Sequence, residues 1–130
     1  MRAFLSLISL TFVLFIAGCT SEEGTGGIAK IKGTVIIHLY NNGVPIDTFG
    51  AQEERVYLTF GENKIYDLDT RTHHNGQYKF EDLKPGNYTA YAYSDCDTCI
   101  ERRNPMEVDV TIGNSQKEVT APHIIIEKHE

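Results

Sequence analysis

Basic residues are scarce in this sequence. It has 12 Lys and Arg against 18 Asp and Glu, which gives a formal net charge of −6 at pH 7. A negative surface repels nucleic-acid phosphates and anionic lipid head groups, so the composition argues against nucleic-acid partners and against docking through a basic patch. The sequence also lacks a nucleophile elbow, a Ser–His–Asp order and a Gly-rich phosphate loop. These absences argue against enzymes built on those motifs.

Long apolar runs and helical periodicity are lacking as well. The apolar stretch at residues 3–16 is broken by Ser6, Ser9 and Thr11, and it is shorter than the roughly 20 residues that a transmembrane helix needs. After it, no segment repeats apolar residues at helical spacing, and no internal repeat or low-complexity tract occurs. The rest of the chain is therefore expected to be one all-β domain.

The N-terminus has the layout of a signal peptide. Met1-Arg2 is a short positive start, the apolar stretch follows, and Ile16-Ala17-Gly18-Cys19 closes it with small residues ahead of a cysteine. These last four residues resemble a bacterial lipobox, which implies removal of residues 1–18 and attachment of fatty acyl chains such as palmitate at Cys19. The alternative is an ordinary secretory signal in which Cys19 is incidental. The lipobox reading predicts a lipoprotein of the cell envelope, at the outer membrane.

Residues 19–28 are expected to form a flexible tether behind this anchor, because they are polar and rich in Gly. Thr20-Ser21-Glu22-Glu23 resembles the short acidic export signal of some surface-displayed lipoproteins, and a plain spacer is the alternative. Residues 29–130 then make up the folded domain.

Seven short strands are predicted from alternating apolar residues and intervening turn residues, and this spacing is typical of a β-sandwich. Residues 44–52 contain Pro45 and Gly50 and are expected to be a surface loop. Pro122 is expected to divide the last strand in two. The predicted strands are residues 33–40, 55–60, 64–72, 77–80, 88–93, 107–112 and 117–127.

Two of these strands form a hairpin around which the domain is organised. Tyr78 and Phe80 share one face of the first strand, and Tyr88, Ala90 and Ala92 share one face of the second. Asn75-Gly76 supplies the positive φ angles of a tight turn before the hairpin. Pro85-Gly86, between the strands, fits the middle of a type II turn.

The hairpin resembles the signature of carboxypeptidase regulatory-like domains, which are transthyretin-like (prealbumin-like) sandwiches related to the B-type repeats of bacterial surface proteins. His73 stands where the family usually has Asp. B-type repeats often hold a Lys–Asn isopeptide crosslink; Lys32 could serve, but the last strand offers no Asn. The resemblance implies a transthyretin-like sandwich that acts as an accessory module without activity of its own. The matching residues are Thr72, Gly76, Tyr78, Phe80, Leu83, Pro85, Gly86 and Tyr88.

Cys96-x-x-Cys99 is the motif with the most chemistry in it. In an oxidising envelope a disulfide is expected, because residues three apart across a turn can meet S–S geometry. Redox catalysis is an alternative, but no helix signal follows to lower a thiol pKa. A zinc site with His73 and His74 is another, if their turn and the cysteine loop share one end of the sandwich. Neither a cofactor nor a calcium site is expected, since Asp67, Asp69, Asp95 and Asp97 lack the spacing of a calcium loop.

Four tyrosines, Tyr57, Tyr66, Tyr91 and Tyr93, are candidates for a sugar-stacking surface, with sandwich packing as the alternative. The predicted function is a non-enzymatic, lipid-anchored envelope protein whose sandwich is a structural or interaction module. The expected partners are the membrane, through the lipid, and an envelope protein or glycan. The alternatives are a carbohydrate- or protein-binding accessory module that uses the tyrosines and residues 95–105, and a thiol-redox or metal-binding protein.

Overall fold

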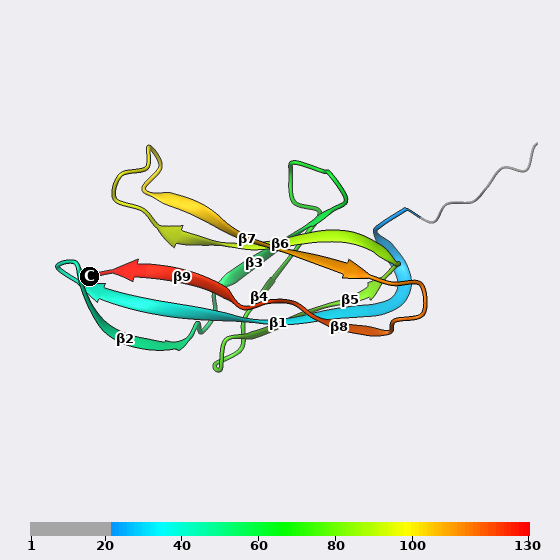
Figure 1. The fold of residues 1–130 in the computed structure, drawn as a ribbon, viewed down its shortest axis with the longest axis horizontal. Coiled ribbons are helices and arrows are strands. Elements are labelled where there is room, and N and C mark those ends of the chain that lie inside the picture. The colour runs from blue at the N-terminus through cyan, green and yellow to red at the C-terminus, as the bar shows by residue number, and fades with distance from the viewer. Residues whose placement is uncertain (1–21) are drawn as a thin grey trace, which may run out of the picture.

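The computed structural model describes residues 22–130, so the predicted signal peptide and Cys19 lie outside the described residues. The described chain is all-β, as predicted, and its strands form two facing sheets (Figure 1). Within these residues, no helix is long and apolar enough to cross a membrane. The strands are β1 (Thr25–Asn41), β2 (Val44–Gly50), β3 (Arg55–Phe60), β4 (Leu68–Arg71), β5 (Gln77–Leu83), β6 (Gly86–Asp95), β7 (Arg103–Ile112), β8 (Glu118–Thr120) and β9 (Ile124–His129).

Strand β1 is the central strand of the first sheet, with which all its other strands pair. Its first part pairs with β5 in antiparallel and with β8 in parallel, and its second part pairs with β2 in antiparallel and with β9 in parallel. The second sheet has the order β4-β3-β6-β7, with all pairs antiparallel. In Figure 1 the β1 sheet forms the lower layer and the β6–β7 hairpin the upper one.

The core lies between the sheets and follows from the period-2 patterns. Tyr78 and Phe80 face inward from β5, and Tyr88, Ala90 and Ala92 face inward from β6, so the predicted faces of the hairpin are confirmed. Burying each large apolar side chain stabilises the fold by roughly 1.5–3 kcal/mol. The other buried apolar residues include Ile31, Val35, Ile37, Val56, Leu58, Leu83, Val110, Ile112, Ile124 and Ile126.

Residues 22–130 form nine strands where seven were predicted. Pro122 does divide the last predicted strand, into β8 and β9, and the other additional strand is β2. The prediction that residues 44–52 form a loop was wrong, because Asn42 and Gly43 both adopt positive φ (51° and 79°). A two-residue Asn-Gly turn of this kind folds the chain straight back on itself, and Val44 then pairs with Asn41.

The two turns flanking β5 differ in detail from the predictions. Only Gly76 of Asn75-Gly76 has a positive φ (84°), and a Cβ there would lie 2.6 Å from the Val35 carbonyl oxygen. Glycine is therefore needed at this point both for φ and for the close approach. At the second turn, the Lys84 carbonyl accepts a hydrogen bond from the Tyr88 hydroxyl (2.6 Å), while in a type II turn at Pro85-Gly86 it would accept from the backbone of residue 87.

Tyr88 also explains why β1 begins earlier than the expected tether boundary. Its hydroxyl accepts a hydrogen bond from the Gly24 N–H (3.0 Å), and the Glu23 carboxylate accepts one from the Asn87 N–H (3.3 Å). These contacts hold the chain from Glu23 onward against the start of β6. Strand β1 then starts at Thr25, inside the segment that composition alone marks as a spacer.

Candidate functional site

The outer face of the second sheet carries a tyrosine cluster, defined as Tyr57, Tyr66, Tyr91 and Tyr93. Tyr57 on β3 and Tyr91 on β6 are register partners, and their rings stack with centroids 5.0 Å apart and planes 17° apart. Tyr93 meets both of these rings edge-on, at 5.6 and 5.7 Å. Tyr66 comes from the loop after β3 and packs edge-on against Tyr57 at 4.8 Å. The four predicted candidates are thus brought together on one surface.

The Tyr91 hydroxyl of this cluster is neutral at neutral pH. Burial, together with the neighbouring Tyr93 and Tyr57, raises the pKa of Tyr91 to about 12. The Arg103 guanidinium lies 4.0 Å above the centre of the Tyr93 ring, in a cation–π contact. Tyr66 is 44% exposed, so part of the cluster remains open to solvent.

An open hollow of about 420 Å³ lies beside the tyrosine cluster. Tyr91, Tyr93, Glu107 and the loop at residues 61–64 line it, together with Thr59, Thr89 and Pro105. The volume is within the range of sites for small ligands. Its lining combines aromatic rings with amide, hydroxyl and carboxylate groups, which is the composition of a binding site for a polar ligand.

Asp67 holds the loop that forms one wall of this hollow. Its carboxylate accepts hydrogen bonds from the Phe60 N–H (2.7 Å) and from the Asn63 side-chain amide (3.1 Å), and its N–H donates to the Leu58 carbonyl (2.8 Å). The loop is therefore fixed at both ends over the sheet, although residues 64–67 were predicted to be part of a strand.

A second hollow of about 580 Å³ continues from the first and shares Gly61, Glu62 and Thr89 with it. Its further lining includes Glu23 and Asp109. The two hollows together are called the outer groove here. It follows the outer face of β6 and β7 from Tyr93 towards the point where the chain enters the fold.

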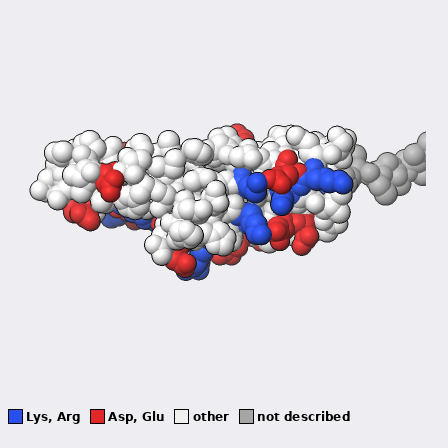
Figure 2. Space-filling model, turned by 90° about the horizontal axis from the view of Figure 1, so that it is seen from below, with Lys and Arg blue, Asp and Glu red and all other residues white. Residues whose placement is uncertain are grey.

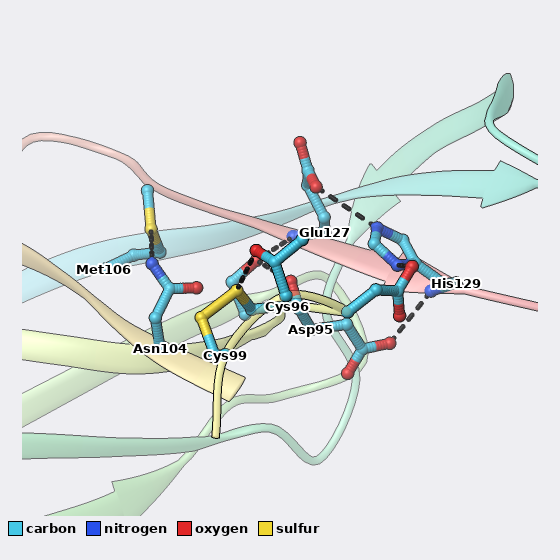
Figure 3. The surroundings of a disulfide bond; sticks show 10 residues. Asp95, Cys96, Cys99, Asn104, Met106, Glu127 and His129 are labelled. Carbon is cyan, nitrogen blue, oxygen red and sulfur yellow. Dashed lines mark hydrogen bonds and ion pairs between the residues drawn. A yellow bond between two sulfur atoms is a disulfide. The ribbon is translucent and has the colours of Figure 1, made fainter. Parts of the chain in front are cut away.

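The predicted disulfide between Cys96 and Cys99 is present, with the two Cα atoms 5.4 Å apart (Figure 3). The loop that contains it is tightened by hydrogen bonds from the Cys96 N–H to the Arg102 carbonyl (2.9 Å) and from the Arg102 N–H to the Cys99 carbonyl (3.1 Å). Strand β7 begins at Arg103, so the irregular segment is shorter than the predicted residues 95–105.

Beside the disulfide, His129 lies between two carboxylates, an arrangement that was not predicted from the sequence. Its Nε2 is 3.2 Å from a Glu127 oxygen (Figure 3). Its Nδ1 is 3.0 Å from an Asp97 oxygen. Both ring nitrogens can donate only in the imidazolium form, and the contacts with Glu127 and Asp97 raise the pKa of His129. The His129 N–H also donates to Asp95 (2.9 Å). The only local indication of this arrangement in the sequence is that Glu127 and His129 are two residues apart and therefore share one face of a strand.

The structure does not bring His73 and His74 together with the two cysteines. Their turn connects β4 in one sheet to β5 in the other. In Figure 1 this turn lies below the sheets, while the disulfide loop lies above them at the left. Among residues 22–130, no group of three His, Cys, Asp or Glu side chains is placed to hold a metal ion.

The residues that carry the family resemblance are structural. Tyr78, Phe80, Leu83 and Tyr88 lie in the core, each at most 4% exposed. Gly86 has φ 146°, and a Cβ there would meet the Glu23 side chain. Among the described residues, the Tyr78 hydroxyl is a buried polar group with no hydrogen-bond partner.

Comparison with known proteins gives no family. No family model and no curated protein matches the sequence. Among solved structures, one from Pseudomonas aeruginosa, described as a "putative carbohydrate binding protein", has a TM-score of 0.46 and 11% sequence identity, and the match covers 83% of this chain and 92% of that one. A similarity of this size carries no information about the ligand of the present chain.

Proposed function

We propose that this chain is a non-enzymatic, lipid-anchored envelope protein whose sandwich binds carbohydrate through the tyrosine cluster. The observation that carries the proposal is the meeting of four tyrosines from two strands and a loop beside an open hollow lined with polar groups. Aromatic rings suit the apolar C–H faces of sugar rings, and the polar groups around them suit the hydroxyls.

A binding role also agrees with how the reactive side chains are used. Cys96 and Cys99 are bonded to each other, and both ring nitrogens of His129 are engaged by carboxylates. A thiol-redox mechanism would have to start from the two cysteines, and His129 is one of the side chains from which acid–base chemistry could start. Their structural engagement favours a binding module over an enzyme.

The anchor is the second half of the proposal and rests on the sequence Ile16-Ala17-Gly18-Cys19. Acyl chains on Cys19 would contribute roughly 0.8 kcal/mol for each buried CH₂ group, enough in total to hold the protein on a membrane. The folded domain would then present its tyrosine cluster to glycans in the envelope.

A glycan array tests the binding role, with the lipidated protein in detergent as the probe. We expect binding to one group of glycans, and an affinity about tenfold lower in Tyr66→Ala and Tyr93→Ala, since each removes a ring worth about 1.4 kcal/mol at an interface. Tyr40→Ala is the matched control, because Tyr40 belongs to the other sheet and packs near His129. Binding that is unchanged in both cluster variants, or absent from every glycan, would contradict the proposal.

A further inference from the structure

The outer groove is lined by more acidic than basic side chains. Glu62 and Glu107 line the first hollow, and Glu23 and Asp109 the second. Among the residues that the structure describes, Lys64 is the only basic side chain in either lining. The groove therefore attracts positively charged ligands more strongly than neutral or acidic ones.

Two of these four carboxylates already have partners within the chain, and two are free to receive a ligand. The partnered ones are Asp109, which accepts a hydrogen bond from the Thr89 hydroxyl (3.2 Å), and Glu23, which accepts one from the Asn87 N–H (3.3 Å). Glu62 and Glu107, in contrast, have neither a side-chain hydrogen bond nor an ion pair within residues 22–130. Glu107 is the register partner of Tyr91, so its carboxylate stands directly beside the tyrosine cluster.

The other sheet shows that unpaired carboxylates are not simply a result of the negative net charge. On its outer face, Glu118 pairs with Lys30 and Lys32, and Glu81 pairs with Lys79. Figure 2, which views the molecule from the side of this sheet, shows blue and red side chains next to one another in this region. Glu118 and Glu81 on that face are neutralised within the chain, as Asp69 next to Tyr57 is by Arg55 at 3.4 Å, whereas Glu62 and Glu107 have no such partner among the described residues.

The tyrosine cluster also holds a cation already. The Arg103 guanidinium lies over the Tyr93 ring at 4.0 Å, and its nearest carboxylate partner, Glu101, is 3.9 Å away. The Tyr93 ring therefore stabilises a positive charge on its face. An ammonium group placed beside Tyr91 would find the same kind of ring together with the Glu107 carboxylate.

We propose that the outer groove binds oligosaccharides of amino sugars whose amino groups are free and protonated. This inference rests on the proposed carbohydrate-binding function and specifies its ligand. The sugar rings lie against Tyr91 and Tyr93, the ammonium groups pair with Glu62 and Glu107, and the second hollow takes the next sugar unit. N-acetylation removes the positive charge and leaves the two carboxylates without partners, which weakens binding.

Calorimetric titration of the lipidated protein in detergent with a glucosamine hexamer, an N-acetylglucosamine hexamer and a hexalysine peptide tests this specificity. We expect the glucosamine hexamer to bind about tenfold more tightly than the acetylated one. Two partly exposed ion pairs, which the acetylated hexamer cannot form, together account for a difference of this size. The double variant Glu62→Gln/Glu107→Gln should remove this preference. Glu81→Gln is the control, because it changes the charge of an exposed carboxylate on the opposite sheet.

The outcomes separate this inference from the function on which it rests. Equal binding of both sugar hexamers, still weakened by Tyr93→Ala, would overturn the amino-sugar inference and leave the carbohydrate-binding proposal standing. Hexalysine binding as tightly as the glucosamine hexamer would overturn it too, because charge alone would then explain the affinity. Absence of binding to either sugar, in agreement with an empty glycan array, would overturn both.

Discussion

Two buried tyrosines of the organising hairpin allow a sharp test of the packing. Tyr78 and Tyr88 are each 2% exposed, but their hydroxyls differ. The Tyr78 hydroxyl has no partner among the described residues. The Tyr88 hydroxyl donates to the Lys84 carbonyl and accepts from the Gly24 N–H. Changing each tyrosine to Phe therefore removes an unpartnered hydroxyl in one case and a hydrogen-bonded hydroxyl in the other.

The expected effects on the free energy of unfolding have opposite signs. A buried polar group without a hydrogen bond costs about 1–3 kcal/mol, so Tyr78→Phe should stabilise the protein by about 1 kcal/mol. Tyr88→Phe leaves the Gly24 N–H and the Lys84 carbonyl without that partner and should destabilise it by about 2 kcal/mol. The two variants should therefore differ by about 3 kcal/mol.

Urea unfolding followed by far-ultraviolet circular dichroism measures both values, and tyrosine fluorescence serves as a second probe because the chain has no Trp. The dependence on urea concentration should be the same in both variants and the parent, so that midpoints report stability. A loss of 1 kcal/mol or more in Tyr78→Phe, on the order of the Tyr88 effect, would refute the reasoning and show that the Tyr78 hydroxyl is hydrogen-bonded in solution.

Alkaline pH gives an independent measurement on the same side chain. Burial raises the pKa of Tyr78 from 10.0 to about 12, so the folded state holds this proton more tightly than the unfolded state. The contribution of this pKa difference to the free energy of unfolding is fully present below pH 10 and is lost as the pH rises towards 12. A difference of this size corresponds to about 3 kcal/mol. In Tyr78→Phe this part of the alkaline loss should be absent.

Three further predictions follow from the other features. Replacing Cys96 and Cys99 by Ser should lower the free energy of unfolding by no more than about 2 kcal/mol and leave the fold intact, because the closed loop is small; alkylation and mass spectrometry without reduction should find no free thiol in the parent. The contacts that raise the pKa of His129 stabilise the fold fully below pH 6.5, and this stability is lost as the pH rises through the raised value. His129→Gln should flatten the dependence of the thermal midpoint on pH in that window, and an unchanged profile would contradict the role of its carboxylate partners. Cys19→Ser should leave the protein soluble and unlabelled by radioactive fatty acid, whereas membrane association without label in the parent would refute lipidation.

The elements that the sequence predicted best are those with strict alternation. Residues 77–80 and 88–93 alternate between apolar and other positions, and each face was assigned correctly because a strand has a period of two. Strand β2 was missed because Pro45 and Gly50 suggested a loop. Pro is tolerated there because β2 lies at the edge of its sheet. The Asn42-Gly43 pair favours a two-residue hairpin turn and should have outweighed Pro45 and Gly50 in the prediction.

The candidate site was predictable only in part, because most of it depends on register. Alternation indicates that Tyr91 and Tyr93 share a face, but no local pattern shows that Tyr57 pairs with Tyr91 across β3 and β6. The contact between His129 and Asp97 joins residues 32 positions apart. It depends on the end of β9 lying beside the end of β6, which strand prediction does not supply.

The contacts of Glu23 connect the proposed anchor to the outer groove. Glu23 lines the second hollow and bonds to Asn87, and it stands four residues after Cys19. A chain of that length spans at most about 14 Å, so an acylated Cys19 would keep this end of the groove close to the bilayer surface. Long glycan chains should then reach the groove less easily on vesicles than in detergent. Short oligomers should bind equally well in both.

Lengthening the tether tests this arrangement directly. A flexible insert of about 20 Gly and Ser residues between Ser21 and Glu22 adds a mean reach of roughly 25 Å and leaves every contact of Glu23 and Gly24 in place. On vesicles, the insert should restore the affinity for a long polymer to its value in detergent, while the affinity for a hexamer stays the same. If the polymer binds the parent protein equally well on vesicles and in detergent, the groove is not confined by the membrane.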